Sequence, residues 1–180
     1  MRCKVLLWTI EELKKMEEFK DIPEETLKQK MNAIESAIRG YTNNKFQNTR
    51  VRFESESKGN VLFSYNDNIK VGDTVEISQS ISNNGLYVVT EIKNRNTYVD
   101  SQLSENIYNL VTKIEYPKDI LEGSLGMLKW NLDNADKIGI ASESLSRHSV
   151  TYFNMDKTNT VSGYPISIMG FCSPYMKAKT

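Results

Sequence analysis

The sequence contains two stretches of helical spacing that are separated by a stretch of strand-like alternation. In the first stretch apolar residues recur three or four positions apart, as on one face of an α-helix; they are Leu27, Met31, Ile34, Ile38 and Tyr41. Alternation with Asn/Gly turns follows from Arg50, and helical spacing returns with Ile120, Leu121, Leu125, Leu128 and Leu132. A chain with this pattern is constrained to fold as a helical domain interrupted by a β module.

We therefore expect an α+β fold, a small helical bundle of about four helices interrupted by an inserted small β-barrel. The helical domain would comprise residues 1–48 and 115–180, and the inserted module residues 49–114. Turn signals at Gly59-Asn60, Asn83–Gly85 and Asn94–Asn96 divide the insert into five or six short strands within about 65 residues. The two ends of the insert should lie close together, so that the bundle stays intact.

Several residues suit the ends of the expected helices. Thr9 and Glu12 form a capping-box pair at the start of the first helix, and Pro23 suits the first position of the second. A last helix is expected from Tyr164 to Ser173, because Pro174 disfavours helical backbone in the residue before it.

The helical faces predict which side chains form the core. We expect seven to be mostly buried: Leu27, Met31, Ile34, Ile38, Leu125, Leu128 and Leu132. Gly123 and Gly126 fall three apart inside the third helix, where each costs about 1 kcal/mol relative to alanine. Their spacing would let a neighbouring element approach closely.

The composition is that of an ordinary globular protein and excludes several classes. Lysine and arginine number 23 and aspartate and glutamate also 23, so the basic excess of a dedicated nucleic-acid or membrane-surface binder is missing. Cys3 and Cys172 lack the spacing of a metal site or a disulfide framework. No apolar run approaches the roughly 20 residues of a membrane span. We expect an intracellular protein that does not bind membranes.

No pattern of catalytic residues is present in the sequence. The single histidine, His148, lies in a polar stretch without the partners of a catalytic triad. Asp133 and Asp136 are the best carboxylate pair for a metal, but solvated charges at a helix end are the more probable interpretation. Neither glycine-rich phosphate-binding motif occurs. We expect no catalytic residues, no metal and no cofactor, and therefore a protein that is not an enzyme.

The aromatic residues of the insert leave one alternative open. Tyr87, Tyr98 and Tyr108, together with Lys93 and Arg95, could form a surface on which nucleic-acid bases stack. Aromatic residues in strands more often serve packing. The alternative function is thus a non-enzymatic binding module, whose β insert contacts nucleic acid or another protein of the same particle.

Four stretches resemble the head–tail connector (adaptor) proteins of tailed bacteriophages. Residues 141–152, ASESLSRHSVTY, resemble a family segment with Ser146 in place of its usual glycine and Arg147 in place of an acidic or amide residue. Residues 163–169 resemble the start of the family's last helix, and residues 173–177, SPYMK, resemble its ending with Met176 in place of arginine. Ile34, Ile38 and Asn44-Lys45-Phe46 occupy the positions of the family's N-terminal helix motif.

The resemblance covers about the first 45 and the last 65 residues. It implies a helical bundle that assembles with copies of itself into a ring, typically dodecameric, below the portal protein. Such a ring extends the DNA channel in the virion neck, lets genomic DNA pass without sequence specificity, and joins the head to the stopper or tail-completion protein. Assembly takes place in the host cytoplasm. Residues 49–114 are absent from minimal members of the family and resemble small SH3-like barrels.

The last residues form a short basic segment that the resemblance directs towards the portal. We expect Pro174, Tyr175, Met176, Lys177 and Lys179 to be the portal-docking residues. A free segment of this kind becomes ordered only on a partner, with Tyr175 as aromatic anchor and the lysines facing an acidic surface. The competing interpretation is a frayed terminus without function.

Overall fold

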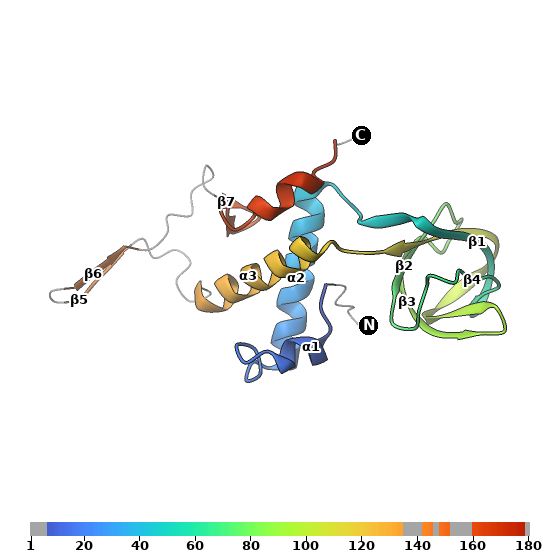
Figure 1. The fold of residues 1–180 in the computed structure, drawn as a ribbon, viewed down its shortest axis with the longest axis horizontal. Helices are drawn as coiled ribbons and strands as arrows, with labels where there is room; N and C mark the ends of the chain where they lie inside the picture. Colours follow the sequence, from blue (N-terminus) through green and yellow to red (C-terminus); the bar gives the residue numbers. More distant parts are fainter. Residues whose placement is uncertain (1–6, 135–141, 146–147, 152–159, 179–180) are drawn as a thin grey trace. The chain divides into compact units, whose positions relative to one another are not determined.

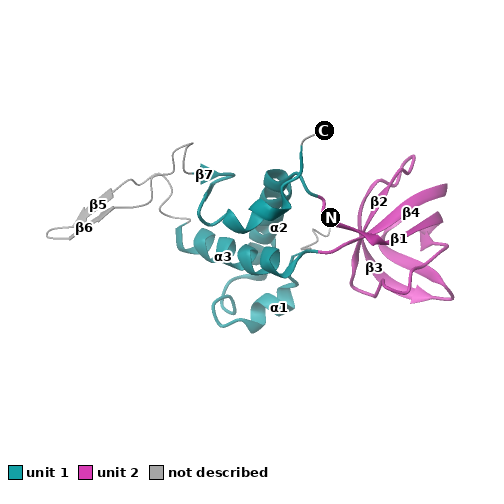
Figure 2. Ribbon diagram, turned by 45° about the horizontal axis from the view of Figure 1, so that its top comes forward, with its two compact units in different colours: residues 1–44, 116–180 teal, residues 45–115 magenta. Residues whose placement is uncertain are grey.

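The computed structural model describes residues 7–134, 142–145, 148–151 and 160–178 (Figure 1). The chain divides into two compact units, residues 1–44 with 116–180 and residues 45–115 (Figure 2). We call the first the helical unit and the second the β unit. The boundaries suggested by the sequence fell at 48/49 and 114/115, beside the observed ones at 44/45 and 115/116.

The helical unit begins with a short capped helix, α1 (Ile10–Lys15). The Thr9 hydroxyl accepts a hydrogen bond from the Glu12 backbone N–H, and the Glu12 carboxylate accepts one from the Thr9 backbone N–H. The predicted capping box is therefore confirmed. The helix ends after six residues at Met16, and Leu13 and Phe19 are buried.

The long helix α2 (Glu24–Thr42) carries the core of the helical unit. Its apolar face is fully buried, as predicted, with Leu27, Met31, Ile34 and Ile38 each 0% exposed. Gly40 lies inside the helix, which ends where Asn43 adopts a left-handed conformation with φ 47°. Asparagine tolerates that conformation, so it can stop a helix as glycine does.

The second long helix, α3 (Lys118–Asn134), packs against α2 with a face that differs from the predicted one (Figure 1). Leu128 is fully buried, whereas Leu125 and Leu132 are buried only in part. Ser124 lies in the middle of the buried face of α3. The Trp8 indole N–H donates to the Ser124 hydroxyl and to the Leu121 carbonyl, both at 3.1 Å, and so satisfies this buried polar side chain. The buried residues of α3 are Ile120, Ser124, Met127 and Leu128.

The expected last helix from Tyr164 to Ser173 does not form. Thr160–Val161 (β7) pairs with Tyr164–Pro165 (β8), because Ser162 and Gly163 both adopt positive φ and close a tight hairpin. A short 3₁₀-helix, η2 (Gly170–Tyr175), follows and contains Pro174 instead of ending before it. Elsewhere in this unit, β5 (Ser142–Leu145) and β6 (His148–Thr151) form an antiparallel pair.

The β unit is a four-stranded antiparallel sheet in the order β1-β4-β2-β3. Its strands are β1 (Gln47–Leu62), β2 (Thr74–Ser78), β3 (Gly85–Lys93) and β4 (Asn96–Ile114). The sheet curls until β3 also pairs with β4. Its core contains nine buried apolar residues: Val51, Leu62, Ile69, Val75, Ile77, Val89, Val99, Leu103 and Val111.

Two strands are much longer than the sequence suggested. Gly59-Asn60 is no turn: Gly59 has φ +64° and sits at a register shift inside β1, which continues to Leu62. A β-bulge uses positive φ without ending the strand. In the same way β4 runs without interruption from Asn96 through the mostly polar residues 100–109. Four strands thus replace the five or six short ones that we expected.

These differences overturn the predicted fold class of a small helical bundle with a small insert. Among the described residues more lie in strands than in helices, so the sheet is at least as large as the helical part. The expected fourth helix is replaced by a hairpin and a short 3₁₀-helix, and α1 has only six residues. The fold is mixed α+β, dominated by the four-stranded sheet and two long helices.

Candidate functional site

The described residues hold no cluster of three side chains suited to bind a metal. His148 belongs to β6, where it pairs with Leu145. Asp133 is exposed on α3, and its expected partner Asp136 lies outside the described residues. In the described part of the chain, no helix combines the length and apolar character needed to cross a membrane.

Two buried titratable groups of the helical unit serve packing. The Tyr116 hydroxyl donates to the Glu35 carboxylate at 2.8 Å, and Arg39 lies 3.4 Å from the same carboxylate. Burial, followed by the Glu35 charge, raises the pKa of the Tyr116 phenol well above its usual range. Burial also raises the pKa of the Cys172 thiol to about 11. A thiol with so high a pKa is protonated and a poor nucleophile at neutral pH.

The C-terminal segment, residues 174–178, is fastened to the end of α2. The Asn44 side chain donates to the Tyr175 carbonyl at 3.0 Å and the Lys177 backbone N–H donates to the Thr42 carbonyl at 2.8 Å. The Asn43 side chain donates to the Ala178 carbonyl at 2.7 Å. The left-handed conformation of Asn43 ends α2 and turns the chain. Thr42, Asn43 and Asn44 therefore all contact the C-terminal segment.

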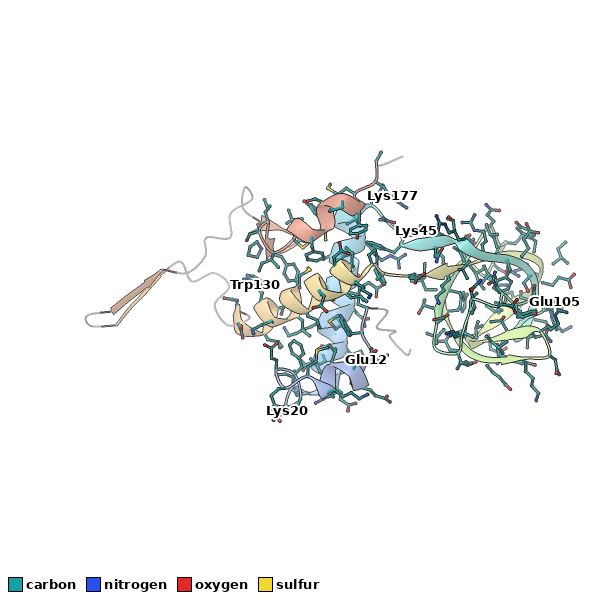
Figure 3. The ribbon with its side chains drawn as sticks, in the orientation of Figure 1. Glu12, Lys20, Lys45, Glu105, Trp130 and Lys177 are labelled. Carbon is teal, nitrogen blue, oxygen red and sulfur yellow. The ribbon has the colours of Figure 1, made fainter. Side chains whose placement is uncertain are left out.

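Tyr175 is held in addition by its side chain. Its hydroxyl lies 2.7 and 2.8 Å from the two carboxylate oxygens of Asp119, and this hydrogen bond raises the pKa of the phenol. The expectation of a free segment is therefore wrong for residues 174–178. Met176 is 53% exposed and Pro174 and Lys177 are exposed, while Lys179 lies outside the described residues. Figure 3 shows Lys177 beside the end of α2.

The β unit carries a hollow of about 440 Å³ on its surface. We call it the β-unit hollow; its lining residues are Glu54, Ser55, Glu56, Phe63, Ser64, Ile107 and Tyr108. Three of these are large apolar or aromatic side chains that face solvent: Phe63 is 51%, Ile107 86% and Tyr108 38% exposed. The lining of the hollow therefore combines exposed apolar and aromatic side chains with two carboxylates.

A β-bulge explains why two successive residues of β4 face outwards. Ser55 pairs with Asn109 and Ser57 with Asn106, so Ile107 and Tyr108 together oppose the single residue Glu56. The extra residue breaks the alternation of faces and re-aims the side chains. The Phe63 backbone N–H donates to the Glu56 carbonyl at 3.0 Å and brings the third apolar side chain to the same place.

The charge of the hollow is negative. Glu54 and Glu56 are both exposed, because they alternate along β1 with the buried Ser55 and Ser57. The Tyr108 hydroxyl lies 3.3 Å from the Glu54 carboxylate, and partial burial followed by the Glu54 charge raises the pKa of its phenol. No lysine or arginine is among the lining residues.

A buried hydrogen-bond network holds the backbone next to the hollow. The Asn83 side chain, in a residue only 3% exposed, donates to Ser57 Oγ and the Ser104 carbonyl at 2.9 Å and to Asn109 Oδ1 at 3.2 Å. Its own carbonyl oxygen accepts from the Ser104 backbone N–H at 2.8 Å. Asn109 in turn donates to the Ser55 carbonyl. The network ties the β2–β3 connection to the bulged region of β1 and β4.

The aromatic residues considered for nucleic-acid stacking have different surroundings. The Tyr87 hydroxyl donates to the Asn83 carbonyl, and Tyr108 lies beside Glu54. The Arg95 guanidinium lies 5.1 Å from the ring of Tyr65, which was not in the predicted set. These contacts serve packing or place a carboxylate beside the ring, so they give no support to a stacking surface.

Comparison with protein-family models and with curated proteins finds no match to this chain. The β-unit hollow was missed in the sequence because Phe63 and Ile107 belong to no regular pattern. The available signal was the adjacent pair Ile107-Tyr108 between asparagines in an otherwise alternating strand. Such a pair marks a bulge, although its partner on β1 cannot be read from the sequence.

Proposed function

We propose that the protein is a head–tail adaptor of a tailed bacteriophage, a structural component of the virion neck without enzymatic activity. In this proposal copies of the chain form a dodecameric ring below the portal protein, extend the channel for genomic DNA and receive the stopper or tail-completion protein. The observation that carries the proposal is the resemblance of residues 141–152, 163–169 and 173–177, in this order and spacing, to the adaptor family.

One contact of the helical unit supports the proposal. The C-terminal stretches that carry the resemblance and the N-terminal stretch up to Asn44 lie far apart in the sequence but within one unit, whereas Lys45 and Phe46 belong to the β unit. They meet where Asn44 donates to the Tyr175 carbonyl and Lys177 to the Thr42 carbonyl. An element used for docking needs a defined position, since a site that is already ordered loses less entropy on binding.

The exposed side chains of the C-terminal segment are the proposed contacts with the portal. Met176 offers a flexible apolar side chain and Lys177 a positive charge, and both are exposed beside the end of α2. Neither side chain takes part in the hydrogen bonds that hold the segment. Substitution of these two side chains therefore tests docking and leaves the hydrogen bonds of the segment in place. Deletion of residues 174–178 would remove those hydrogen bonds to the end of α2 as well.

The experiment joins purified chain to heads that carry the portal encoded in the same genome, and measures the bound chain by sedimentation. The double variant Met176→Ser, Lys177→Glu should remain folded and bind about tenfold more weakly, since it loses an apolar contact and reverses a charge. Lys15→Glu is the matched control, because Lys15 is an exposed lysine at the end of α1. The proposal is wrong if the wild-type chain does not bind such heads; equal binding by both variants rejects this docking site.

A second candidate function is that of a binding module, in which the β unit holds another protein. The exposed β-unit hollow favours it, because three large apolar side chains gather there around an open depression. Contiguous exposed apolar surface is typical of an interaction site. The two functions are compatible, since the hollow belongs to the β unit and the proposed portal contacts to the helical unit.

A further inference from the structure

We propose that the β-unit hollow binds a cationic segment of a partner protein, one in which an aliphatic residue is flanked by lysine or arginine. The aliphatic side chain would lie on Phe63 and Ile107, and the flanking cation would pair with Glu54 or Glu56. This inference does not depend on the adaptor function, because it rests only on side chains of the β unit.

The whole hollow has the size for a few side chains. A volume of about 440 Å³ holds a short stretch of peptide but no large folded element. Ile107 at 86% and Phe63 at 51% exposure leave much apolar surface in contact with water, and covering it is favourable by about 25 cal/mol per Å².

The carboxylates determine the charge of the occupant. Glu56 is exposed, and among the described residues its carboxylate has no ion pair or hydrogen bond. Of the nearby cations, Lys58 pairs with Glu105 at 3.0 Å. The Arg52 side chain donates to the neutral Thr112 hydroxyl at 3.0 Å, and its charge also acts on Tyr108, where it opposes the rise of the phenol pKa. A lysine or arginine brought in by a partner therefore finds an open carboxylate beside an apolar surface.

The same charges argue against nucleic acid as the occupant. A strand that stacked a base on Tyr108 would bring phosphates close to Glu54, which lies 3.3 Å from the Tyr108 hydroxyl. Like charges repel, and nucleic-acid affinity depends strongly on the neutralisation of phosphates. Both Glu54 and Glu56 would add repulsion, so the hollow favours a cationic peptide over nucleic acid.

The hollow is also rigid enough to act as a docking site. Ser55, one of its lining residues, is held through its carbonyl by Asn109, which belongs to the buried network around Asn83. The bulge that presents Ile107 and Tyr108 is fixed on the β1 side by Ser57, which donates to the Ser104 carbonyl at 2.9 Å. A preformed site binds with less loss of conformational entropy than a flexible one.

The experiment titrates the full chain with a short blocked peptide, GKLKG, and follows the backbone amides by two-dimensional NMR. Controls are the charge-reversed peptide GELEG, the peptide GKGKG that lacks the aliphatic side chain, and a short single-stranded DNA. We expect GKLKG to shift the amide signals of Phe63, Ile107 and Tyr108, and the other three ligands to leave them unchanged.

A charge-reversed protein supplies the second arm. In Glu54→Lys, Glu56→Lys the affinity for GKLKG should fall by about tenfold and GELEG should gain binding, because two attractions become two repulsions. Both residues are exposed, so the fold should survive, and a dispersed NMR spectrum checks this. The matched variant Asp67→Lys, Glu91→Lys changes two other exposed carboxylates of the β unit and should bind GKLKG like the wild type.

Three results overturn the proposal. In the first, GKLKG shifts signals elsewhere on the chain or none at all. In the second, the charge-reversed protein keeps the wild-type preference for GKLKG. In the third, the DNA shifts the signals of the hollow while the peptides do not, which would make the β unit a nucleic-acid binder.

Discussion

Replacement of Gly123 by alanine tests how closely η2 packs against α3. A Cβ added to Gly123 would lie 2.4 Å from Cδ1 and Cε1 of the Phe171 ring and 2.5 Å from its Cγ. Carbon atoms in favourable contact are about 3.5–4.0 Å apart, so the ring would have to move by roughly 1 Å. Of the two glycines that we expected to allow close approach, only Gly123 has this contact, since nothing lies within 4 Å of a Cβ at Gly126.

The two glycines form a matched pair in one helix. Replacing either glycine by alanine should stabilise the helix by about 1 kcal/mol, because alanine has the higher helix propensity. At Gly123 the displaced Phe171 ring costs about 1–3 kcal/mol, as in other overpacked sites. Gly123→Ala should therefore leave the free energy of unfolding of the helical unit unchanged or lower it by up to about 2 kcal/mol, whereas Gly126→Ala should raise it by up to about 1 kcal/mol.

Urea denaturation followed by circular dichroism at the helix band measures both variants. The double variant Gly123→Ala, Phe171→Leu provides a coupling test, because a smaller flexible side chain removes the clash and should recover part of the loss. If Gly123→Ala stabilises the protein as much as Gly126→Ala does, η2 does not pack on α3 in the way described here.

Three further changes test the two cores separately. Asn83→Ala should lower the stability of the β unit by about 2–4 kcal/mol, because it leaves several buried polar partners unsatisfied, and Ser82→Ala beside it should change little in the same urea titration. Ile34→Ala should cost about 2–5 kcal/mol and Leu125→Ala clearly less, since only the first is fully buried. The pKa of Tyr116 is raised above 10.0 in the folded chain, so the folded state holds its proton more tightly, and stability should fall as the pH rises above about 10. Tyr116→Phe should make this fall less steep when unfolding is measured between about pH 9 and 11.

The regular helices could be predicted because their signals are local. The face of α2 follows from the spacing of Leu27, Met31, Ile34 and Ile38, and the start of α1 from the Thr9 and Glu12 pair. On α3 the spacing of the leucines did not predict the buried face correctly. The burial of Ser124 depends on its hydrogen bond with Trp8, which is more than a hundred residues away in the sequence. A partner so distant leaves no trace in local periodicity.

The strands of the β unit were recognised as strands, but not their lengths. Gly59-Asn60 has the composition of a turn, and only the pairing of β1 with β4 shows that the backbone continues through a bulge. At the end of the chain the Tyr164–Pro165 segment pairs with Thr160–Val161 in place of starting a helix. In both places a glycine with positive φ was compatible with two local structures, and contacts elsewhere in the fold decided between them.

The two candidate binding surfaces differ in how far the sequence indicated them. The C-terminal residues were singled out through the resemblance to the adaptor family, although their attachment to Asn43 and Asn44 was not foreseen. The β-unit hollow was not foreseen at all, because it combines Glu54 of β1 and Phe63 directly after β1 with Ile107 of the distant strand β4. Only the paired strands bring them together.

The mass of the assembly formed with the portal protein of the same genome tests the proposed function most directly. Native mass spectrometry of a mixture of portal and excess chain should show one species that contains the whole portal and a full ring of chains, with no partly filled rings at saturation. A spectrum that contains only free portal and free 20.6 kDa chain, at concentrations where neck proteins assemble, would contradict the proposal that this protein is an adaptor.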